Sequence, residues 1–145
     1  MSAPLPAAPA VAAPRARWMA RATGVGLAVL GVLLTWVLVD PILGVDLSVT
    51  ESGTTTVVGP GVIIGLALGA ALLGWAFLAV LERFVAARAR LIWTAVAVAV
   101  LAISCVAPFT SGEMDTSARW SLLAMHLVVG AAVIPLFARR TGDSA

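Results

Sequence analysis

The residue best suited to chemistry is a histidine inside a long apolar segment. His126 is the only histidine of the chain, and it lies well within the apolar run 119–138. An ionisable side chain at such a depth is costly, and it usually faces the protein interior and finds a partner there. Two interpretations stay open. The imidazole is either a neutral group that bonds a hydroxyl or a carbonyl and fixes its helix, or a group that transfers protons or orients a substrate.

Two charged residues join His126 as candidates for catalysis. Asp40 ends the first apolar run, and Arg119 lies two helical turns before His126 on the same helix face. Asp40 is either a solvated carboxylate at a helix end or a general acid or base that works with His126 on a lipid-soluble substrate. Because Arg119 stands among five acids, we expect it to pair with one of three carboxylates: Asp40, Glu113 or Asp115.

A layer of polar residues is predicted at the depth of the histidine. Counted at 1.5 Å per residue from one set of helix ends, several polar side chains fall roughly 6–9 Å below the surface. Under the proton-transfer interpretation of His126, this layer lines a pocket that opens outward. Its members are Thr35, Trp36, Ser104, Cys105 and His126, with Gly65 beside them.

The chain has few residues for redox or metal chemistry. The single Cys105 excludes an intramolecular disulfide and a Cys-x-x-Cys pair. Met114, Met125, Cys105 and His126 are soft ligands that suit copper(I), but no Met-x-x-Met or His-x-x-x-His spacing brings them together. We therefore expect neither a metal nor a cofactor, and the order of residues contains no Ser-His-Asp triad or phosphate loop.

Four apolar segments must position these residues. The runs 22–43, 59–81, 91–109 and 119–138 each hold about 20 residues, which matches a hydrocarbon core of about 30 Å at the helical rise. The chain is 61% hydrophobic and 11% charged, with a mean hydropathy of +1.08. These values predict an all-α membrane protein, a bundle of four transmembrane helices in the lipid bilayer.

The charges predict the orientation of the bundle. Eight of the nine arginines lie at one set of run ends and five of the seven acids lie at the other set. By the positive-inside rule both termini are cytoplasmic, and we expect a multi-pass protein of the plasma membrane. The arginines are divided among three segments that face anionic lipid, so the pI of about 10.0 does not indicate a nucleic-acid partner.

The chain divides into three parts. Residues 1–20 form a disordered cytoplasmic tail rich in Ala and Pro, residues 21–140 form the transmembrane domain, and residues 141–145 form a short cytoplasmic tail. The first apolar run follows three arginines, as a signal peptide would. However, it continues to Val39 and ends without a small-x-small cleavage site, so we expect it to remain as an anchor.

The first outer loop alternates with a period of two. Residues 45–58 read as two short strands around Glu51-Ser52-Gly53, with Val45, Leu47 and Val49 on one face toward the bundle or the lipid headgroups. An isolated hairpin is marginal in water, so an extended loop without fixed pairing is the alternative.

Small residues recur at intervals of four in the second run. Gly61, Gly65 and Gly69 form a stripe that allows a neighbouring backbone to approach closely. We favour a second helix of the same bundle as that neighbour, with Ala95 and Ala99 as its counterpart, over a seam between two copies. Trp93 and Trp120 lie at run ends, where indole rings anchor helices in the interface.

The last span carries a resemblance. Trp120-Ser121, Met125-His126-Leu127, Gly130 and Ile134-Pro135, together with the end of the third run from Ser104 to Pro108, resemble a family of small four-span actinobacterial membrane proteins of unknown function. The resemblance covers residues 20–140. It implies four helices in an actinobacterial plasma membrane and no established activity.

Three classes of function fit these observations. We favour a non-catalytic structural or accessory membrane component that engages a membrane-protein partner or a second copy. The alternative is a small membrane enzyme that acts on a lipid or isoprenoid in an outer-leaflet pocket around His126. A small multidrug transporter ranks behind both, because its first span would need a carboxylate and none lies between Ala22 and Val39.

Overall fold

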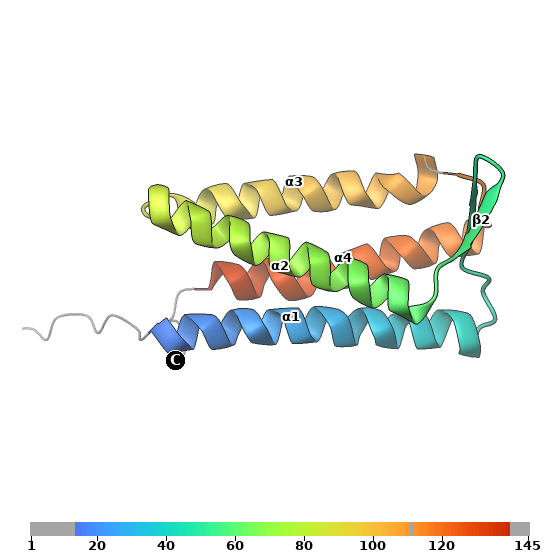
Figure 1. Ribbon diagram of the computed structural model, residues 1–145, viewed down its shortest axis with the longest axis horizontal. Coiled ribbons are helices and arrows are strands. Elements are labelled where there is room, and N and C mark those ends of the chain that lie inside the picture. The colour runs from blue at the N-terminus through green and yellow to red at the C-terminus, as the bar shows by residue number, and fades with distance from the viewer. Residues whose placement is uncertain (1–13, 111, 140–145) are drawn as a thin grey trace, which may run out of the picture.

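Four long helices run alongside one another through almost the whole molecule (Figure 1). The computed structural model describes residues 14–110 and 112–139. All four helices are long and apolar enough to cross a membrane, which confirms the predicted spans. The helices are α1 (Pro14–Val37), extended by a π-helical turn η1 (Leu38–Ile42), α2 (Pro60–Phe84), α3 (Ala89–Thr110) and α4 (Thr116–Ala138).

The helices form a ring in chain order. α1 packs against α2 and α4, and α3 packs against the same two helices, so α2 and α4 lie at opposite corners. Each helix runs antiparallel to the next one in the chain (Figure 1). This is the architecture of a multi-pass membrane protein.

The first helix begins earlier than the sequence indicates. α1 starts at Pro14, a residue type that suits the first turn because it lacks an N–H. Residues 14–20 are therefore helical, although the sequence analysis assigned them to the tail. The predicted disorder of residues 1–13 and the predicted C-terminal tail 141–145 lie outside the described residues.

The first helix ends in a widened turn around Pro41. A proline inside a helix cannot donate a backbone hydrogen bond, and its ring collides with the preceding turn. The backbone N–H of Leu43 instead donates to the carbonyl of Leu38, and that of Val45 donates to the carbonyl of Val39, over five and six residues. Gly44, at φ +67°, then turns the chain across the end of the bundle.

The first loop is a β-hairpin, as one of the two sequence interpretations predicted. β1 (Ser48–Glu51) pairs with β2 (Thr54–Val57) in antiparallel register, with Thr50 opposite Thr55. Ser52 and Gly53 form the turn at φ values of +52° and +79°. Positive φ at both central residues is the feature of the type I′ turn, whose twist matches that of the strands.

The hairpin is also joined to the loop between α3 and α4. The backbone N–H of Thr50 donates to the carbonyl of Glu113 at 2.9 Å, and the N–H of Glu113 donates to the carbonyl of Thr50 at 2.8 Å. Gly112 makes this approach possible, because it has φ +44° and a Cβ there would lie 2.8 Å from the Thr50 oxygen.

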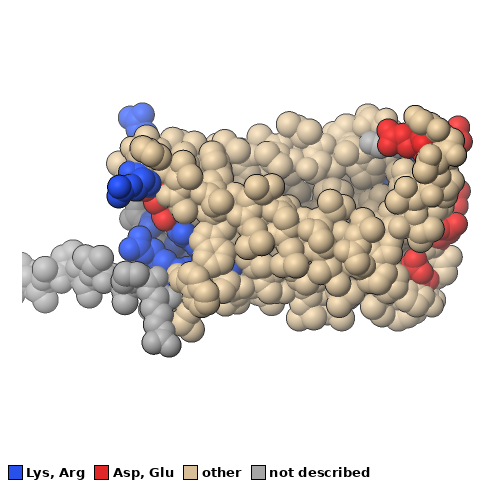
Figure 2. Space-filling view, in the orientation of Figure 1, with Lys and Arg blue, Asp and Glu red and all other residues tan. Residues whose placement is uncertain are grey.

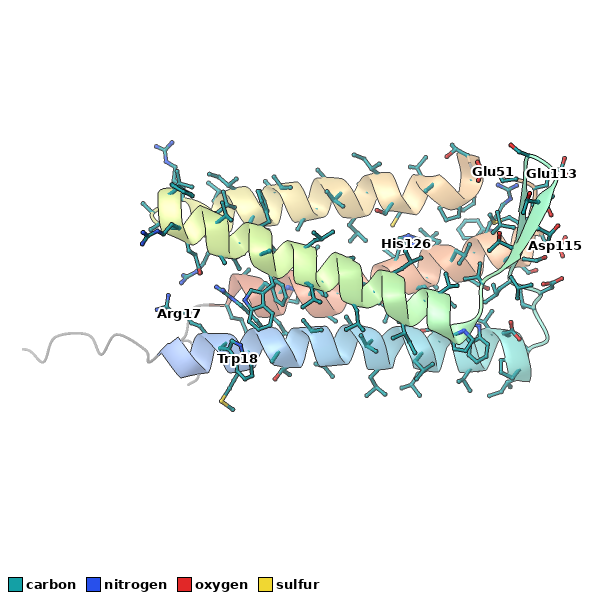
Figure 3. The ribbon with its side chains drawn as sticks, in the orientation of Figure 1. Arg17, Trp18, Glu51, Glu113, Asp115 and His126 are labelled. Carbon is teal, nitrogen blue, oxygen red and sulfur yellow. The ribbon has the colours of Figure 1, made fainter. Side chains whose placement is uncertain are left out.

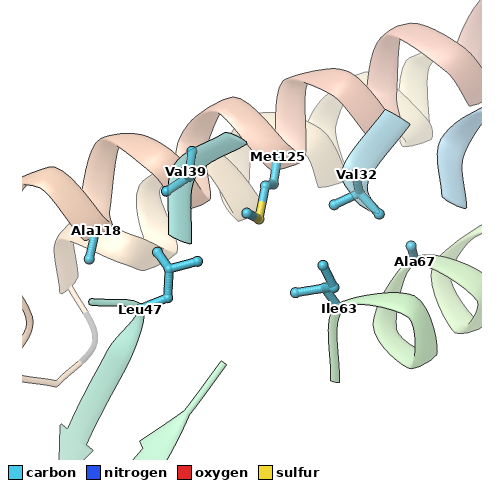
Figure 4. Close-up of a cluster of buried hydrophobic side chains, with 7 residues drawn as sticks. All are labelled: Val32, Val39, Leu47, Ile63, Ala67, Ala118 and Met125. Atoms are coloured by element: carbon cyan, nitrogen blue, oxygen red, sulfur yellow. The ribbon is translucent and has the colours of Figure 1, made fainter. Parts of the chain in front are cut away.

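The interior contains two hydrophobic clusters. The first, drawn in Figure 4, lies under the hairpin and is built from aliphatic side chains and one methionine. The second lies at the other end of the bundle and contains aromatic side chains. The buried members of the first cluster are Val32, Val39, Leu47, Ile63, Ala67, Ala118 and Met125. Those of the second are Ala28, Ala71, Leu78, Trp93, Val133 and Phe137.

The glycines that pack helices together are not those the sequence analysis selected. A Cβ at Gly61, Gly65 or Gly69 would meet nothing within 4 Å, so our expectation that the stripe seats another helix of the same bundle is wrong. The proposed counterparts Ala95 and Ala99 are exposed as well.

Close packing occurs instead at three glycines of other helices. A Cβ at Gly31 of α1 would lie 2.7 Å from Val128, and one at Gly130 of α4 would lie 2.5 Å from Leu101. At Gly24 of α1 it would lie 3.0 Å from Phe137. α4 therefore contacts α1 and α3 at glycine positions, where helix backbones approach closely.

Charge is separated between the two ends of the molecule. Figure 2 shows acidic side chains gathered at the hairpin end and basic side chains at the opposite end, with uncharged surface between them. We call these the acidic end and the arginine end. The separation follows from the sequence, since eight of the nine arginines lie at one set of span ends and five of the seven acids lie at the other set.

Candidate functional site

A cap of hydrogen-bonded loops closes the acidic end. We define the cap as residues 45–58 and 112–115, which include the hairpin and the segment paired with it. Leu47 is the residue that fixes the cap to the bundle, because its side chain is 1% exposed and lies in the first cluster. Val45 packs against the same cluster. The predicted inward face of the hairpin is thus confirmed for these two residues.

Trp36 fastens the other end of the hairpin. Its indole Nε1–H donates to the carbonyl of Val58 at 3.2 Å, and its ring packs against the first cluster. Val58 in turn donates its backbone N–H to the carbonyl of Leu47 at 2.7 Å. The tryptophan therefore joins α1 to the connection between β2 and α2.

Arg119 supports the cap from below, and it does so through backbone carbonyls. Its Nη1 donates to the carbonyl of Pro108 at 2.7 Å, and its Nη2 donates to the carbonyl of Gly112 at 3.3 Å. The Pro108 carbonyl is one of the last of α3, where free carbonyls and the helix dipole attract a cation. The predicted pairing of Arg119 with Asp40, Glu113 or Asp115 is therefore wrong among the residues described.

The cap displays carboxylates to its surroundings. Asp46, Glu51, Glu113 and Asp115 are exposed, and Asp40 is half-buried just below them. Figure 3 shows Glu51, Glu113 and Asp115 projecting from the cap, away from the helices. A shallow hollow lies on this surface, and Ser48, Glu113, Met114 and Asp115 line it.

His126 bonds its own helix. Its Nδ1 lies 2.7 Å from the carbonyl oxygen of Leu122, one turn earlier in α4. Since a carbonyl only accepts, the neutral tautomer that fits this contact carries its proton on Nδ1 and leaves Nε2 as an acceptor. The side chain is half-buried. This geometry is that of a locally satisfied imidazole, and neither Asp40 nor Arg119 is a hydrogen-bond partner of it within the described ranges.

The other residues of the predicted polar layer also do not bond one another. The Thr35 hydroxyl donates to the carbonyl of Gly31 at 2.8 Å in its own helix, while Trp36 bonds the cap. Ser104 and Cys105 are half-buried on α3. In the part of the chain that the structure describes, no hydrogen bond joins Thr35, Ser104, Cys105 and His126, so they do not form one connected set.

The side chains that could bind a metal ion are also not gathered in one place in the described residues. Across residues 14–110 and 112–139, no three His, Cys, Asp or Glu side chains lie close enough together to hold an ion.

The arginine end is closed by large side chains and one ion pair. Nη2 of Arg21 on α1 lies 2.6 Å from Oε1 of Glu82 on α2, with side-chain exposures of 11% and 26%. The rings of Trp18 on α1 and Trp75 on α2 lie 6.2 Å apart, tilted at 59° to each other. Glu82 is the one acid at the arginine end among the described residues, and its place among arginines is the sequence signal from which an ion pair could have been predicted.

Trp93 was expected to anchor its helix in the membrane interface, and the structure places it elsewhere. Its side chain is 2% exposed, its Nε1–H donates to the carbonyl of Gly74 at 2.9 Å, and its ring centre lies 5.5 Å from that of Phe137. It is a core residue and not an interface anchor. Trp120, by contrast, is 59% exposed, as expected for an anchor.

Two features of the cap escaped the sequence analysis. The pairing of Glu113 with Thr50 extends the hairpin by one residue, and Gly112 permits it. The only sequence signal is Gly112 in a short acidic loop, which indicates a turn but not its partner.

Comparison with known proteins identifies a protein family that covers almost the whole chain. Residues 12–143 match a protein family described as a family of unknown function (DUF6069). No curated protein and no solved structure matches the chain.

Proposed function

The chain belongs to this family of unknown function, and from the geometry of its two ends we propose that it is a non-catalytic accessory component of the membrane. In this role the helices hold the cap at the membrane surface, and the cap presents a fixed acidic surface to a protein partner.

The construction of the cap carries the proposal. Three separate contacts order it: the backbone pairing of Thr50 with Glu113, the guanidinium of Arg119 on two carbonyls, and the burial of Leu47. Ordering loops costs conformational entropy of about 1–2 kcal/mol per residue. A surface that is held in one conformation loses less of that entropy on binding, which favours association with a partner.

The environment of His126 supports a non-catalytic role. A proton-transferring histidine is generally oriented by a second functional group and faces the reacting atom. Here the contact of Nδ1 is the backbone carbonyl of Leu122, and the hollow at the acidic end is lined by residues of the cap. The enzyme hypothesis therefore rests on the Nε2 atom of His126 alone.

The proposal includes an orientation. The arginine end faces the cytoplasm and the acidic end faces outward across the plasma membrane, because arginine-rich loops are retained on the cytoplasmic side. The described arginines at the ends of the helices that form the arginine end are Arg17, Arg21, Arg83, Arg88, Arg90 and Arg139. Reporters fused after Ala145 test this. Activity of a reporter that works only in the cytoplasm is expected, and activity of one that works only outside would overturn the orientation.

Native purification tests the accessory role. The protein is isolated in mild detergent from its own membrane, and bound proteins and lipids are identified by mass spectrometry. We expect a stoichiometric protein partner that is lost in the Glu113→Gln/Asp115→Asn variant and kept in His126→Leu. A specific lipid or prenyl species lost only in His126→Leu would instead support the enzyme.

A further inference from the structure

The strand β2 is an unprotected sheet edge. In the described ranges β1 has β2 on one side and Glu113 on the other, whereas β2 has β1 alone. All four residues of β2 are exposed. Natural proteins usually block a free edge with lysine, proline, a bulge or a covering segment, because its backbone groups pair readily with another strand. The sequence Thr54-Thr55-Thr56-Val57 contains none of these blocking residues.

The hydrogen-bond pattern shows which groups point outward from β2. The backbone N–H and C=O of Thr50 both bond Glu113. The backbone of Thr50 therefore does not bond the backbone of Thr55, the residue opposite it in β2. The two hydroxyl oxygens lie 2.8 Å apart, as the close side chains of a non-hydrogen-bonded pair would. The backbone N–H and C=O of Thr55, and the N–H of Val57, therefore point away from the hairpin.

The sheet lies flat over the bundle end. One face of β1 is directed at the helices, since Leu47 at its start is buried among them, and Figure 1 shows the strands crossing the bundle end. The sheet normal is thus close to the direction of the helix axes. A two-fold axis along the membrane normal is then perpendicular to the sheet, and it relates β2 to an antiparallel β2 of a second copy with the same orientation in the membrane.

The glycine stripe of α2 lies on the side facing away from the bundle. Ile63, Ala67 and Ala71 are three of the four buried residues of α2. Gly61, Gly65 and Gly69 each precede one of these three by two positions. Two positions correspond to about 200° around a helix, so the glycines face away from the core. A Cβ at any of them would meet nothing, and α2 follows β2 directly in the chain.

We propose that two copies of this chain form a two-fold symmetric dimer, joined by antiparallel pairing of their β2 strands and by contact between their α2 glycine faces. With Thr56 opposite its counterpart, the outward groups of Thr55 bond those of Val57 in the other copy in both directions. This register places the two Val57 Cα atoms about 8 Å apart. The α2 helices of the two copies, which follow β2 in the chain, would then start at about the distance that separates two packed helices.

A second copy of the chain would cover both the free edge of β2 and the glycine face of α2. Another kind of partner would cover one of these two surfaces. An extended peptide on the water side would pair with β2 but would leave the glycine face of α2 in lipid. Three glycines inside a helix cost up to about 1 kcal/mol each relative to alanine, and close approach of a second helix is what offsets this cost in membranes. The inference does not depend on the proposed function, since either an accessory protein or an enzyme can be dimeric.

Cysteine crosslinking in native membranes tests the strand contact. The background is Cys105→Ala, which removes the only cysteine of the chain. Thr56→Cys places two thiols in a non-hydrogen-bonded pair, where the Cα separation of about 4.5–5.5 Å allows a disulfide. With copper phenanthroline as oxidant we expect a disulfide-linked dimer from Thr56→Cys.

The control is Glu51→Cys, an equally exposed position on β1 near the turn. It should yield little dimer, because β1 is separated from the proposed axis by β2. Absence of dimer from Thr56→Cys, or equal amounts from both variants, would overturn the strand pairing. Crosslinking of Thr56→Cys to a different protein would show that the occupant is not a second copy.

A pair of leucine substitutions tests the helix contact. Gly65→Leu adds bulk to the proposed interface, and Gly26→Leu adds it to an exposed glycine of α1 that also has nothing within 4 Å. We expect Gly65→Leu to weaken dimerisation about tenfold, measured by light scattering at graded detergent-to-protein ratios, and Gly26→Leu to leave it unchanged. Equal dimerisation in both variants would remove the glycine face from the interface.

Discussion

The two ends of the bundle are closed by different kinds of interaction. At the acidic end, backbone hydrogen bonds between loops and a guanidinium on carbonyls hold a thin cap over an aliphatic cluster. At the arginine end, the rings of Trp75, Trp93 and Phe137 fill the space between the helices, and an ion pair joins α1 to α2 in the part of the chain that the structure describes. The cap is therefore built by chain conformation, and the arginine end is built by side-chain volume.

This difference predicts which substitutions each end tolerates. Closure by side-chain volume is sensitive to truncation of a single large residue, because the neighbours relax only partly into the space. Closure by backbone pairing is sensitive to a residue that cannot adopt the required φ, and is otherwise indifferent to side-chain size.

The largest effect is expected from Trp93→Ala. This change removes the most buried aromatic ring and its hydrogen bond to Gly74, and it should lower the free energy of unfolding by about 3–5 kcal/mol. The measurement is thermal or denaturant unfolding in detergent. Trp120→Ala, the same change at an exposed position, should cost far less. Equal losses would mean that Trp93 does not hold the arginine end together.

A smaller effect is expected from Gly112→Ala at the acidic end. The added Cβ meets the Thr50 oxygen and the residue must hold a positive φ, so we expect a loss of about 2–3 kcal/mol. Gly44→Ala is the matched control, because Gly44 also has a positive φ but open space around it. It should cost only about 1 kcal/mol. If the two variants unfold alike, pairing with the hairpin contributes nothing.

The ion pair should contribute less again. Glu82→Gln keeps the shape of the side chain but removes its charge beside Arg21, and we expect a loss of about 1–2 kcal/mol that shrinks at high salt. Glu51→Gln, at an exposed carboxylate of the cap without a described ion-pair partner, should leave stability within experimental error. A double-mutant cycle with Arg21→Gln isolates the pair, and a coupling energy of zero would contradict it.

The smallest effect is expected at His126. The Leu122 carbonyl that it bonds also lies in the helical ladder of α4, so His126→Leu leaves no group without a partner. We expect a loss below about 1 kcal/mol, and unchanged recovery of a bound partner. His126→Gln should behave in the same way. A folded His126→Leu protein that has lost its cellular function would instead indicate that Nε2 acts on a substrate.

Much of the fold could be predicted because its signals are local. The length and hydropathy of each segment specify four spans. The alternation in residues 45–58 predicted the hairpin as one of two interpretations, and the structure has the hairpin. The separation of arginine from acid is a property of the run ends, so it appears unchanged in the structure. Each of these features needs only the physics of one segment against lipid or water.

The candidate site could be predicted only in part. His126 was identified as a buried polar group, but its partner on the same helix turn was one of several open alternatives. Arg119 was expected to bond a carboxylate, and it bonds the carbonyls of Pro108 and Gly112 because α3 ends beside it. The acceptor that Arg119 can reach depends on where α3 ends in space, and the residues around Arg119 in the sequence do not indicate that position.

The sequence by itself determined the spans and the charged ends and left the hairpin as one of two alternatives, whereas tertiary structure alone decided which face of each span meets another helix. Gly24, Gly31 and Gly130 pack closely while Gly61, Gly65 and Gly69 are open, although all six are glycines in apolar helices. Trp93 is buried and Trp120 is exposed, although both lie at helix ends. In a soluble protein an apolar stripe would mark the inner face, but in lipid both faces of a helix are apolar. The rotation of each helix is then set by the fit of its side chains against its neighbours, and only the folded bundle specifies that fit.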